Sequence, residues 1–390
     1  MLNNKVIMTE ETYGHPPIKK MFDLADGYGI GFDKKYYSRK KIRLGIIGVG
    51  GISQSKHIPA INRLITTWEQ IELVAISEIN KEQGKKIARI YNCKLYYNYV
   101  DMIKNEKLDG VIISTPYLYH FEPALYCLKS GINVLLEKPF TLLLSEGKIL
   151  CDYAKEKGLI LMAVSQKRFS PPYRKAKQIL KDGVVENPAL FCGKFNHGFG
   201  KKKGNLLFED GAIHLFDLAR YFMGDVSEVY SIGVNKYKKT NYPVDFAIIN
   251  FKFSSGSIGN IYTTNQALSL KPWERIEIYG DNRWIAIEDQ AKLILYEGEE
   301  EPAKYWEPLL ASTLLFDEEF GGYTGLIENF VQAIRGKEEP LVTGWDGFKA
   351  YELSVASHLS LKHKEAVSLP LDIEESEREI KEWLNFVFKK

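Results

Sequence analysis

From Lys41 onward, short apolar runs alternate with longer amphipathic segments, and this alternation constrains the fold more than any other feature of the sequence. The intervening segments have the length of helices. Apolar runs of this kind are typical of strands buried on both faces of a parallel sheet, with helices as crossover connections. The sequence therefore predicts an α/β domain whose strands include Ile42–Ile47, Leu73–Ile76, Val111–Ile113, Val134–Leu136 and Ile160–Val164.

A different pattern begins after about Ser170. One helical stretch, Glu209–Met223, precedes several strand-like runs with turns such as Ser254-Ser255-Gly256 between them. Such turns suit hairpins, so an α+β domain with a largely antiparallel sheet is expected. The expected strands are Val226–Val234, Ala247–Phe253, Ser257–Thr264, Arg275–Tyr279, Trp284–Ile287 and Leu293–Tyr296, and the later helices are Tyr323–Ile334, Trp345–Lys362 and Ile373–Phe388.

The chain has 390 residues, which is too long for one compact core and predicts two domains. Residues 1–40 have no clean periodicity and several glycines and prolines, so they are interpreted as an N-terminal arm of unknown role. The first domain is expected over 41–165, the second over 166–371, and a helical tail over 372–390.

Composition excludes several classes of function. The net charge of +2 gives no electrostatic basis for binding nucleic acid or a membrane surface, and no apolar run is long enough to span a bilayer. Met1–Lys20 lacks the apolar core of a secretory signal. The cysteines Cys93, Cys127, Cys151 and Cys192 have no CxxC spacing. No metal site is expected, and reduced thiols in the cytoplasm are the simplest interpretation.

A glycine-rich loop follows the first apolar run directly. Gly48-Val49-Gly50-Gly51-Ile52-Ser53 has the pattern G-x-G-x-x-S. In such a loop the first glycine permits a tight turn, the second lets the backbone approach a pyrophosphate, and a small third residue lets the helix pack on the strand. The phosphates then lie at a helix N-terminus, where free N–H groups favour anions. The loop predicts a dinucleotide site.

Glu78 ends the second apolar run, where a carboxylate can accept hydrogen bonds from the adenosine ribose and repel a 2′-phosphate. This position favours NAD over NADP. The alternative is a solvated glutamate at a strand end.

Lys138 follows the buried run Val134–Leu136 within Glu137-Lys138-Pro139. Ligands of open α/β sheets bind beyond the carboxyl ends of the strands, where a lysine can stabilise negative charge on a substrate oxygen. The alternative is an ordinary surface lysine.

A second catalytic candidate combines Asp210 with His214, followed by Asp217. In an α-helix these residues share one face, where a carboxylate can orient an imidazole and support it as a general base. The alternative is a capped helix with a core histidine.

Together these segments resemble the Gfo/Idh/MocA oxidoreductase family, which includes inositol dehydrogenases and glucose–fructose oxidoreductase. The resemblance covers about Lys41 to Leu371. The sequence departs from the family pattern at Tyr117, where asparagine is common, and at Ala212, where glycine is common. The matching segments are Glu137-Lys138-Pro139, the GxGxxS loop, Thr115-Pro116 with His120, Arg168-Phe169-Ser170-Pro171, Asp210 with His214 and Asp217, and Pro340 to Gly347.

The resemblance implies an NAD(P)-dependent dehydrogenase acting on a sugar, inositol or related polyol. It implies a large, mostly antiparallel C-terminal sheet and a homodimer or homotetramer built through it. Lys138 and His214 would be catalytic, with Asp210 orienting His214. The expected cofactor contacts are Gly48, Gly50, Gly51, Ile52, Ser53, Glu78, Thr115, Pro116, His120, Glu137 and Lys138. The expected substrate contacts are Lys138, Gln166, Arg168, Asn196, His197, Asp210, His214 and Trp273.

Two other functions fit the same fold. Some relatives use tightly held NAD for transient oxidation, which gives glycosidase or epimerase chemistry without net redox change. A non-catalytic protein that senses dinucleotides is the second alternative, and the presence of both Lys138 and His214 argues against it. Fold alone does not decide between them.

Overall fold

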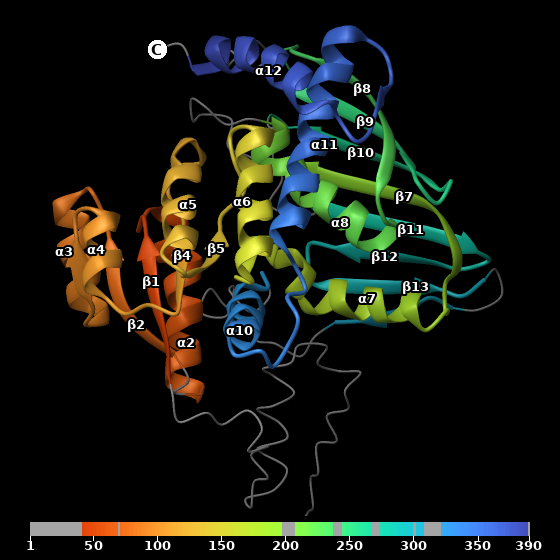
Figure 1. Cartoon of the computed structure of the whole chain (residues 1–390). Coiled ribbons are helices and arrows are strands. Elements are labelled where there is room, and N and C mark those ends of the chain that lie inside the picture. The colour runs from red at the N-terminus through yellow and green to blue at the C-terminus, as the bar shows by residue number, and fades with distance from the viewer. Residues whose placement is uncertain are drawn as a thin grey trace, which may run out of the picture.

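The chain forms two sheets that lie side by side with helices between them (Figure 1). This computed structural model describes residues 41–68, 71–196, 207–236, 244–264, 266, 273–298, 302–307 and 321–388. The expected N-terminal arm, residues 1–40, lies outside the described residues.

The first sheet has six parallel strands in the order β3-β2-β1-β4-β5-β6. This order confirms the predicted α/β architecture. The strand order reverses between β1 and β4, which is where ligands bind in open α/β sheets. The strands are β1 (Ile42–Ile47), β2 (Ile71–Ser77), β3 (Lys94–Tyr96), β4 (Gly110–Ile113), β5 (Asn133–Leu136) and β6 (Leu161–Ala163), and the helices between them are α2 (Ile58–Trp68), α3 (Lys81–Tyr91), α4 (Tyr99–Asn105), α5 (Phe121–Lys129) and α6 (Leu144–Lys157).

The second sheet has nine strands in the order β14-β13-β12-β11-β7-β10-β9-β8-β15. All neighbouring pairs are antiparallel except β7 with β10, so the predicted mostly antiparallel sheet is confirmed. The strands are β7 (Glu186–Asn196), β8 (Val226–Val234), β9 (Phe246–Phe253), β10 (Ile258–Thr264), β11 (Glu274–Asp281), β12 (Trp284–Glu288), β13 (Lys292–Tyr296), β14 (Lys304–Trp306) and β15 (Val367–Ser368).

Helix α11 joins the two halves of the molecule, because it packs on β8 and α8 on one side and on α6 and β6 on the other (Figure 1). A Cβ atom at Gly347 would lie 2.5 Å from the Cβ of Ala163, so only glycine lets α11 approach β6 this closely. The C-terminal half contains the helices η3 (Gln166–Phe169), α7 (Pro171–Lys181), η4 (Leu207–Ala212), α8 (Ile213–Met223), α10 (Tyr323–Ile334), α11 (Gly344–His363) and α12 (Ile373–Phe388).

Within the described residues, no helix combines the length and the apolar character needed to cross a membrane.

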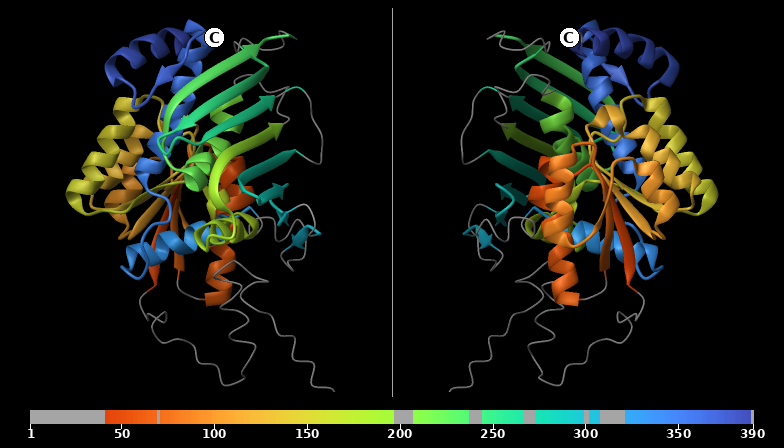
Figure 2. Two further views of the ribbon diagram at one scale, coloured as in Figure 1. Left: turned by 90° about the vertical axis from the view of Figure 1, so that its right-hand side faces the viewer. Right: turned by 90° about the vertical axis from the view of Figure 1, so that its left-hand side faces the viewer.

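Side chains alternate between the two faces of β8 and β9. One face is buried and carries α8 and α11, and the other is exposed (Figure 2). Ile232, Ile248 and Tyr262 lie directly opposite one another on three neighbouring strands, and they are 56%, 51% and 47% exposed. The outer face of the second sheet is therefore partly apolar.

Candidate active site at the junction of the two sheets

The glycine loop connects β1 to η1 (Ser53–His57), a π-helical turn that leads into α2. Gly48 has a φ of +84°, and a Cβ atom there would lie 2.9 Å from the backbone nitrogen of Thr115. A Cβ atom at Gly50 or Gly51 would have no neighbour within 4 Å. The first glycine is therefore required by the turn, whereas the other two leave open space above the loop. This space beside a helix start fits a dinucleotide pyrophosphate.

This difference predicts separable effects of two substitutions. Gly50→Ala should leave the thermal stability of the cofactor-free protein unchanged. It should weaken NAD binding by about tenfold or more, because the methyl group displaces a charged group from its N–H donors. Gly48→Ala should also destabilise the fold by about 1–2 kcal/mol, the cost of a left-handed backbone. Thermal melts and calorimetric NAD titrations measure both effects. Unchanged NAD affinity in Gly50→Ala would show that the phosphates bind elsewhere.

Ser53 connects the glycine loop to the end of β4 through hydrogen bonds. Its side chain is fully buried, and its hydroxyl donates to the Gly48 carbonyl oxygen at 2.8 Å. The same hydroxyl lies 2.5 Å from the Oγ of Ser114. Ile52, which precedes Ser53, is half-buried against the core. The serine that replaces the usual third glycine thus stabilises the loop through its side chain.

Thr115, Pro116 and His120 form one hydrogen-bonded turn after β4. Pro116 precedes the short helix η2 (Tyr117–Tyr119), and the Thr115 hydroxyl donates to the Tyr119 carbonyl oxygen at 3.0 Å. The His120 ring is fully buried, with its nitrogens facing the carbonyl oxygens of Thr115 (2.9 Å) and Pro139 (3.0 Å). Burial lowers the pKa of His120. The ring therefore links two loops, and its direct contact with a cofactor stays a prediction.

Glu78 lies at the end of β2 beside the glycine loop and is 9% exposed. Its carboxylate accepts hydrogen bonds from the backbone N–H of Val49 at 2.9 Å and of Asn80 at 2.8 Å. Each oxygen keeps a second lone pair, so the carboxylate can hold the loop and still accept a ribose hydroxyl. The predicted ribose contact is compatible with this geometry.

Glu137 and Lys138 follow β5, and a cis peptide bond joins Lys138 to Pro139. The Glu137 carboxylate is buried and accepts hydrogen bonds from His57 Nε2 at 2.8 Å and from the Lys138 backbone N–H at 2.9 Å. Burial alone would raise the pKa of Glu137, but the hydrogen bond and the electrostatic interaction with His57, followed by the Lys138 charge, hold that pKa below its usual range. Glu137 is therefore a buried, ionised carboxylate that accepts a hydrogen bond from the Lys138 backbone.

Lys138 and His214 line one pocket, although they belong to different halves of the chain. The pocket lies between β5, β6, α8 and α11. Its other lining residues are Phe140, Ala163, Val164, Ser165, Ile213, Asp217, Gly347 and Ala350. The structure thus brings together the two residues that the sequence predicted to be catalytic.

The helix before His214 differs from the prediction. The sequence predicted one α-helix over Glu209–Met223, but the structure has the π-helical turn η4 over Leu207–Ala212, and α8 begins at Ile213. A π-turn is wider than an α-turn, so Asp210 and His214 do not have the expected α-helical spacing. The side chain of Asp210 lies outside the described residues, and its role stays a prediction.

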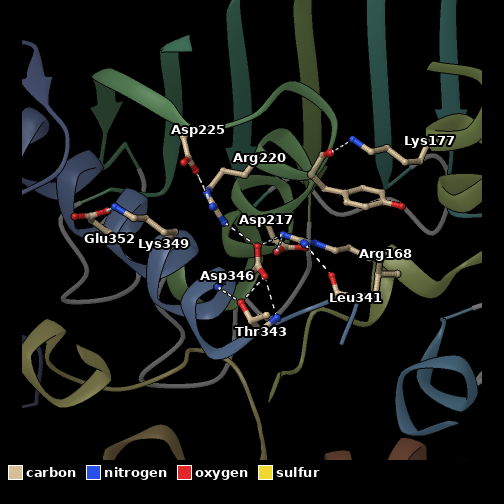
Figure 3. A network of polar contacts seen from close by, with 11 residues as sticks. Arg168, Lys177, Asp217, Arg220, Asp225, Leu341, Thr343, Asp346, Lys349 and Glu352 are labelled. Atoms are coloured by element: carbon tan, nitrogen blue, oxygen red, sulfur yellow. Dashed lines mark hydrogen bonds and ion pairs between the residues drawn. The ribbon is translucent and has the colours of Figure 1, made fainter. Parts of the chain in front are cut away.

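Asp217 was expected to share a helix face with His214, and it lines the same pocket. Its carboxylate accepts two hydrogen bonds from Arg168, at 2.9 Å from Nε and 2.7 Å from Nη2 (Figure 3). Burial raises the pKa of Asp217, and the Arg168 charge opposes this shift. Arg168 also donates to Asp346, to which Arg220 donates as well. Arg168 therefore holds α8 against the start of α11, and a direct substrate contact stays a prediction.

The structure describes three of the four remaining substrate candidates. Gln166 is 6% exposed, and its buried Oε1 has no hydrogen-bond partner among the described residues. The Asn196 backbone N–H donates to the Trp273 carbonyl oxygen at 2.8 Å. The ring centroid of Phe195 lies 5.4 Å from that of Trp273 and 5.9 Å from that of His214, which places Trp273 near the pocket. His197 lies outside the described residues.

The sequence did not identify Lys167 as a site residue. Its buried amino group contacts the Glu274 carboxyl group and lies 4.8 Å and 4.9 Å from the ring centroids of Phe195 and Trp273. Burial lowers the pKa of Lys167 and raises the pKa of Glu274. The Tyr173 hydroxyl donates to the same carboxylate. The only sequence signal was the position of Lys167 beside Arg168, because Glu274 is remote in sequence.

Glu209 and His358 form a second buried hydrogen-bonded pair, and the sequence did not indicate it. The Glu209 carboxylate lies 2.8 Å from His358 Nε2 and accepts a hydrogen bond from Ser354 at 2.9 Å. Burial alone would raise the pKa of Glu209, but the charge of His358 and these hydrogen bonds lower it. The pair links η4 to α11, so it fixes the turn that precedes His214.

This arrangement can support proton transfer at a hydroxyl group. A lysine ammonium can donate to the substrate oxygen, and a nearby imidazole can accept the hydroxyl proton. The described residues contain no cluster of three or more side chains suited to binding a metal ion.

Comparisons with known proteins match both halves of the chain. Residues 42–165 match the family model described as "Oxidoreductase family, NAD-binding Rossmann fold", and residues 196–369 match "Oxidoreductase family, C-terminal alpha/beta domain". Myo-inositol 2-dehydrogenase of Thermotoga maritima is 25% identical over 84% of this chain and 98% of its own length. The scyllo-inositol 2-dehydrogenase (NAD(+)) of Bacillus subtilis is 24% identical over 84% of this chain and 96% of its own length.

Solved structures share the fold. A levoglucosan dehydrogenase in complex with NADH and L-sorbose superposes with a TM-score of 0.76 over 85% of this chain and 99% of its own. Its sequence identity is 20%. At this identity the similarity shows a common architecture only.

Proposed function

Since the chain belongs to the Gfo/Idh/MocA oxidoreductase family and carries its NAD-binding Rossmann fold, we propose that it is an NAD-dependent dehydrogenase of a sugar, inositol or related polyol. The observation that carries this proposal is the shared pocket of Lys138 and His214. The pocket lies at the carboxyl end of β5, on the same edge of the sheet as the glycine loop.

In the proposed reaction, His214 accepts the proton of the substrate hydroxyl while Lys138 donates a hydrogen bond to the same oxygen. Bound NAD supplies the hydride acceptor. The Arg168–Asp217 ion pair and the Glu209–His358 pair hold the helix that carries His214, and Asp210 is proposed to orient the imidazole. The glycine loop and Glu78 are proposed to bind the dinucleotide.

A hydroxyl-rich substrate is supported by the polar residues that line the pocket, which are Lys138, Ser165, His214 and Asp217. The relatives named as inositol dehydrogenases point to the same class. The test is a screen of sugars, sugar acids and inositols with NAD and with NADP, measured as absorbance of the reduced cofactor. Turnover of hydrophobic alcohols alone would contradict the proposal.

The screen also separates the alternatives. Consumption of substrate without release of NADH would indicate transient oxidation, as in an epimerase or glycosidase. Dinucleotide binding without turnover of any polyol would indicate a sensing protein. The dehydrogenase proposal requires stoichiometric NADH for each substrate molecule oxidised.

NAD is proposed as the preferred cofactor because of Glu78. The wild-type protein should bind NAD more tightly than NADP. Glu78→Ala should reduce the ratio of the two affinities by about tenfold, since charge repulsion with a 2′-phosphate is worth about 1 kcal/mol or more. Fluorescence titration of both dinucleotides measures the ratio. Equal or tighter binding of NADP by the wild type would contradict the assignment.

A homodimer or homotetramer is proposed, built through the outer face of the second sheet. Large exposed apolar faces mark interfaces. Ile248→Arg should convert the oligomer to a monomer, which light scattering measures. This monomer should still melt as a folded protein, because the Ile248 side chain is 51% exposed. Ile90→Arg, at an exposed position on α3, is the matched control and should leave the mass unchanged. A wild-type monomer at micromolar concentrations would contradict the proposal.

The cytoplasmic location stays a proposal. All four cysteines are unpaired, and burial raises the pKa values of the Cys127 and Cys151 thiols, as expected for inert thiols in a reducing compartment.

A further inference from the structure

A second pocket lies near the C-terminal end of α8, whereas His214 lies near the start of this helix. The cavity has a volume of about 160 Å³, and none of the residues that line it lines the catalytic pocket. The proposed reaction does not use this cavity. Its lining residues are Arg220, Asp225, Val226, Ser254, Lys349, Glu352, Leu353, Leu369 and Pro370.

Arg220 is a largely buried cation in the wall of this second pocket, with a side chain that is 13% exposed. Its Nε and Nη2 donate to Asp225 Oδ1 at 3.0 Å and 2.7 Å, and its Nη1 donates to Asp346 Oδ1 at 3.4 Å (Figure 3). Asp346 is itself fixed, because its other oxygen accepts from the backbone N–H and the hydroxyl of Thr343. The guanidinium is therefore held in place on the side away from Asp225.

Asp225 is a partner that a ligand can replace. Its side chain is 62% exposed, and a single oxygen accepts both N–H groups from Arg220. The Nε and Nη2 edge of an arginine fits a carboxylate whose two oxygens each accept one N–H. A ligand carboxylate can make this two-bond contact, and the released Asp225 carboxylate would be hydrated. The exchange therefore leaves no buried charge without a partner.

The other walls supply a second cation and an apolar surface. Lys349 donates to Glu352 Oε2 at 2.8 Å, and Glu352 Oε1 accepts the Leu371 backbone N–H at 3.0 Å, so this buried carboxylate uses both oxygens within the protein. A cavity of roughly 150 Å³ holds a benzene molecule, so an apolar body of about six carbon atoms fits here. The apolar wall consists of Val226, Leu353, Leu369 and Pro370.

We propose that this pocket is a second ligand site, which binds a small organic carboxylate through Arg220 and packs its apolar body against the opposite wall. An anion is favoured over a cation, because the buried Arg220 stays in place whereas the exposed Asp225 can leave. The proposal goes beyond the dehydrogenase function and does not depend on it. Helices α8 and α11 line both pockets, so the ligand would contact the helix that carries His214.

The test uses benzoate as the probe and benzamide as its neutral counterpart of nearly equal shape. Both are titrated into the full-length protein and followed by the NMR signals of the ligand. Benzoate should bind with a Kd of about 1 mM or below, as expected for a ligand of this size. Benzamide should bind about tenfold more weakly or not at all, because it lacks the charge that strengthens the hydrogen bonds to Arg220.

Two substitutions should shift the benzoate affinity in opposite directions. Arg220→Lys keeps the charge but cannot make the two-bond contact, so it should weaken binding about tenfold. Asp225→Asn removes the competing negative charge, so it should tighten binding about fivefold. If the Arg220–Asp225 pair only stabilises the fold, Asp225→Asn should not improve binding. Arg89→Lys, at an exposed position on α3, is the matched control and should leave the affinity unchanged.

Lys138→Ala tests whether benzoate binds in the catalytic pocket instead. The affinity should stay at the wild-type value in this variant, since Lys138 does not line the second pocket. Weaker binding in Lys138→Ala with unchanged binding in Arg220→Lys overturns the proposal, as does equal binding of benzoate and benzamide.

If Arg220→Lys is not recovered folded, Asp225→Asn decides the question, because its side chain is exposed and the fold should tolerate the change. Unchanged or weaker benzoate binding in Asp225→Asn then contradicts the site. A protein that binds benzoate as expected but oxidises no polyol supports the second site, while the dehydrogenase function fails separately.

Discussion

Lys138→Ala is expected to lower kcat by about 10³-fold, on the scale observed when a preorganised donor to a developing oxyanion is removed. Lys138 lines the pocket with His214, where we propose that its ammonium donates to the substrate oxygen. Glu137, the buried partner of Lys138, stays in place in this variant, so the fold should be retained. Steady-state kinetics with the substrate from the screen measure the effect.

Lys148→Ala is the matched control for this variant. Lys148 is an exposed lysine on α6 that pairs only with Asp152 among the described ion pairs, so its removal should leave kcat unchanged. NAD affinity, measured by calorimetry, should change little in Lys138→Ala. Near-normal turnover would show that the catalytic pocket lies elsewhere. Loss of turnover together with loss of NAD binding would assign Lys138 to the cofactor.

The strands of the first sheet could be predicted closely because the sequence pattern of each strand lies within one short segment. Each buried strand is a short apolar run, and the glycine loop follows β1 directly, so neighbouring residues specify both the strand and the turn. The strand β3 was missed because its residues are only partly buried at the edge of the sheet. The family resemblance is confirmed by the two matching family models.

The second sheet shows where local patterns fail. Six of its strands were predicted, but β7 was not, although it lies in the middle of the sheet. Pro188 and Gly193 interrupt its pattern, and both residues normally argue against a central strand. Its parallel pairing with β10 joins segments that are far apart in sequence, which no local pattern records.

The sequence indicated candidate site residues where one segment carries the chemistry, and it missed the supporting residues where two segments must meet. Lys138 and His214 were identified from strand-end and helix positions, and the structure places them in one pocket. His57 and Glu209 were not identified, because each looks like an ordinary helical residue until its partner is known. The π-turn before His214 was also missed, since its sequence spacing fits an α-helix equally well.

His214→Ala is expected to lower kcat by about 10²–10⁴-fold, the usual contribution of a general base. The affinity for NAD should stay close to that of wild type, because His214 lies on α8, whereas the glycine loop and Glu78 belong to the first sheet. A general base must be unprotonated to accept the hydroxyl proton, so wild-type oxidation should fall as pH decreases. This acid limb should disappear in His214→Ala, since the residual reaction no longer depends on an imidazole.

His363→Ala is the matched control for this substitution. His363 is a surface histidine at the end of α11, paired with Glu379, and its removal should change neither kcat nor the pH profile. Activity of His214→Ala near the wild-type value would show that another group accepts the proton. A persistent acid limb in a slow His214→Ala variant would assign the titration to a different residue and leave His214 a role in packing against Phe195. The pH profile therefore separates a histidine that transfers the proton from one that only shapes the pocket.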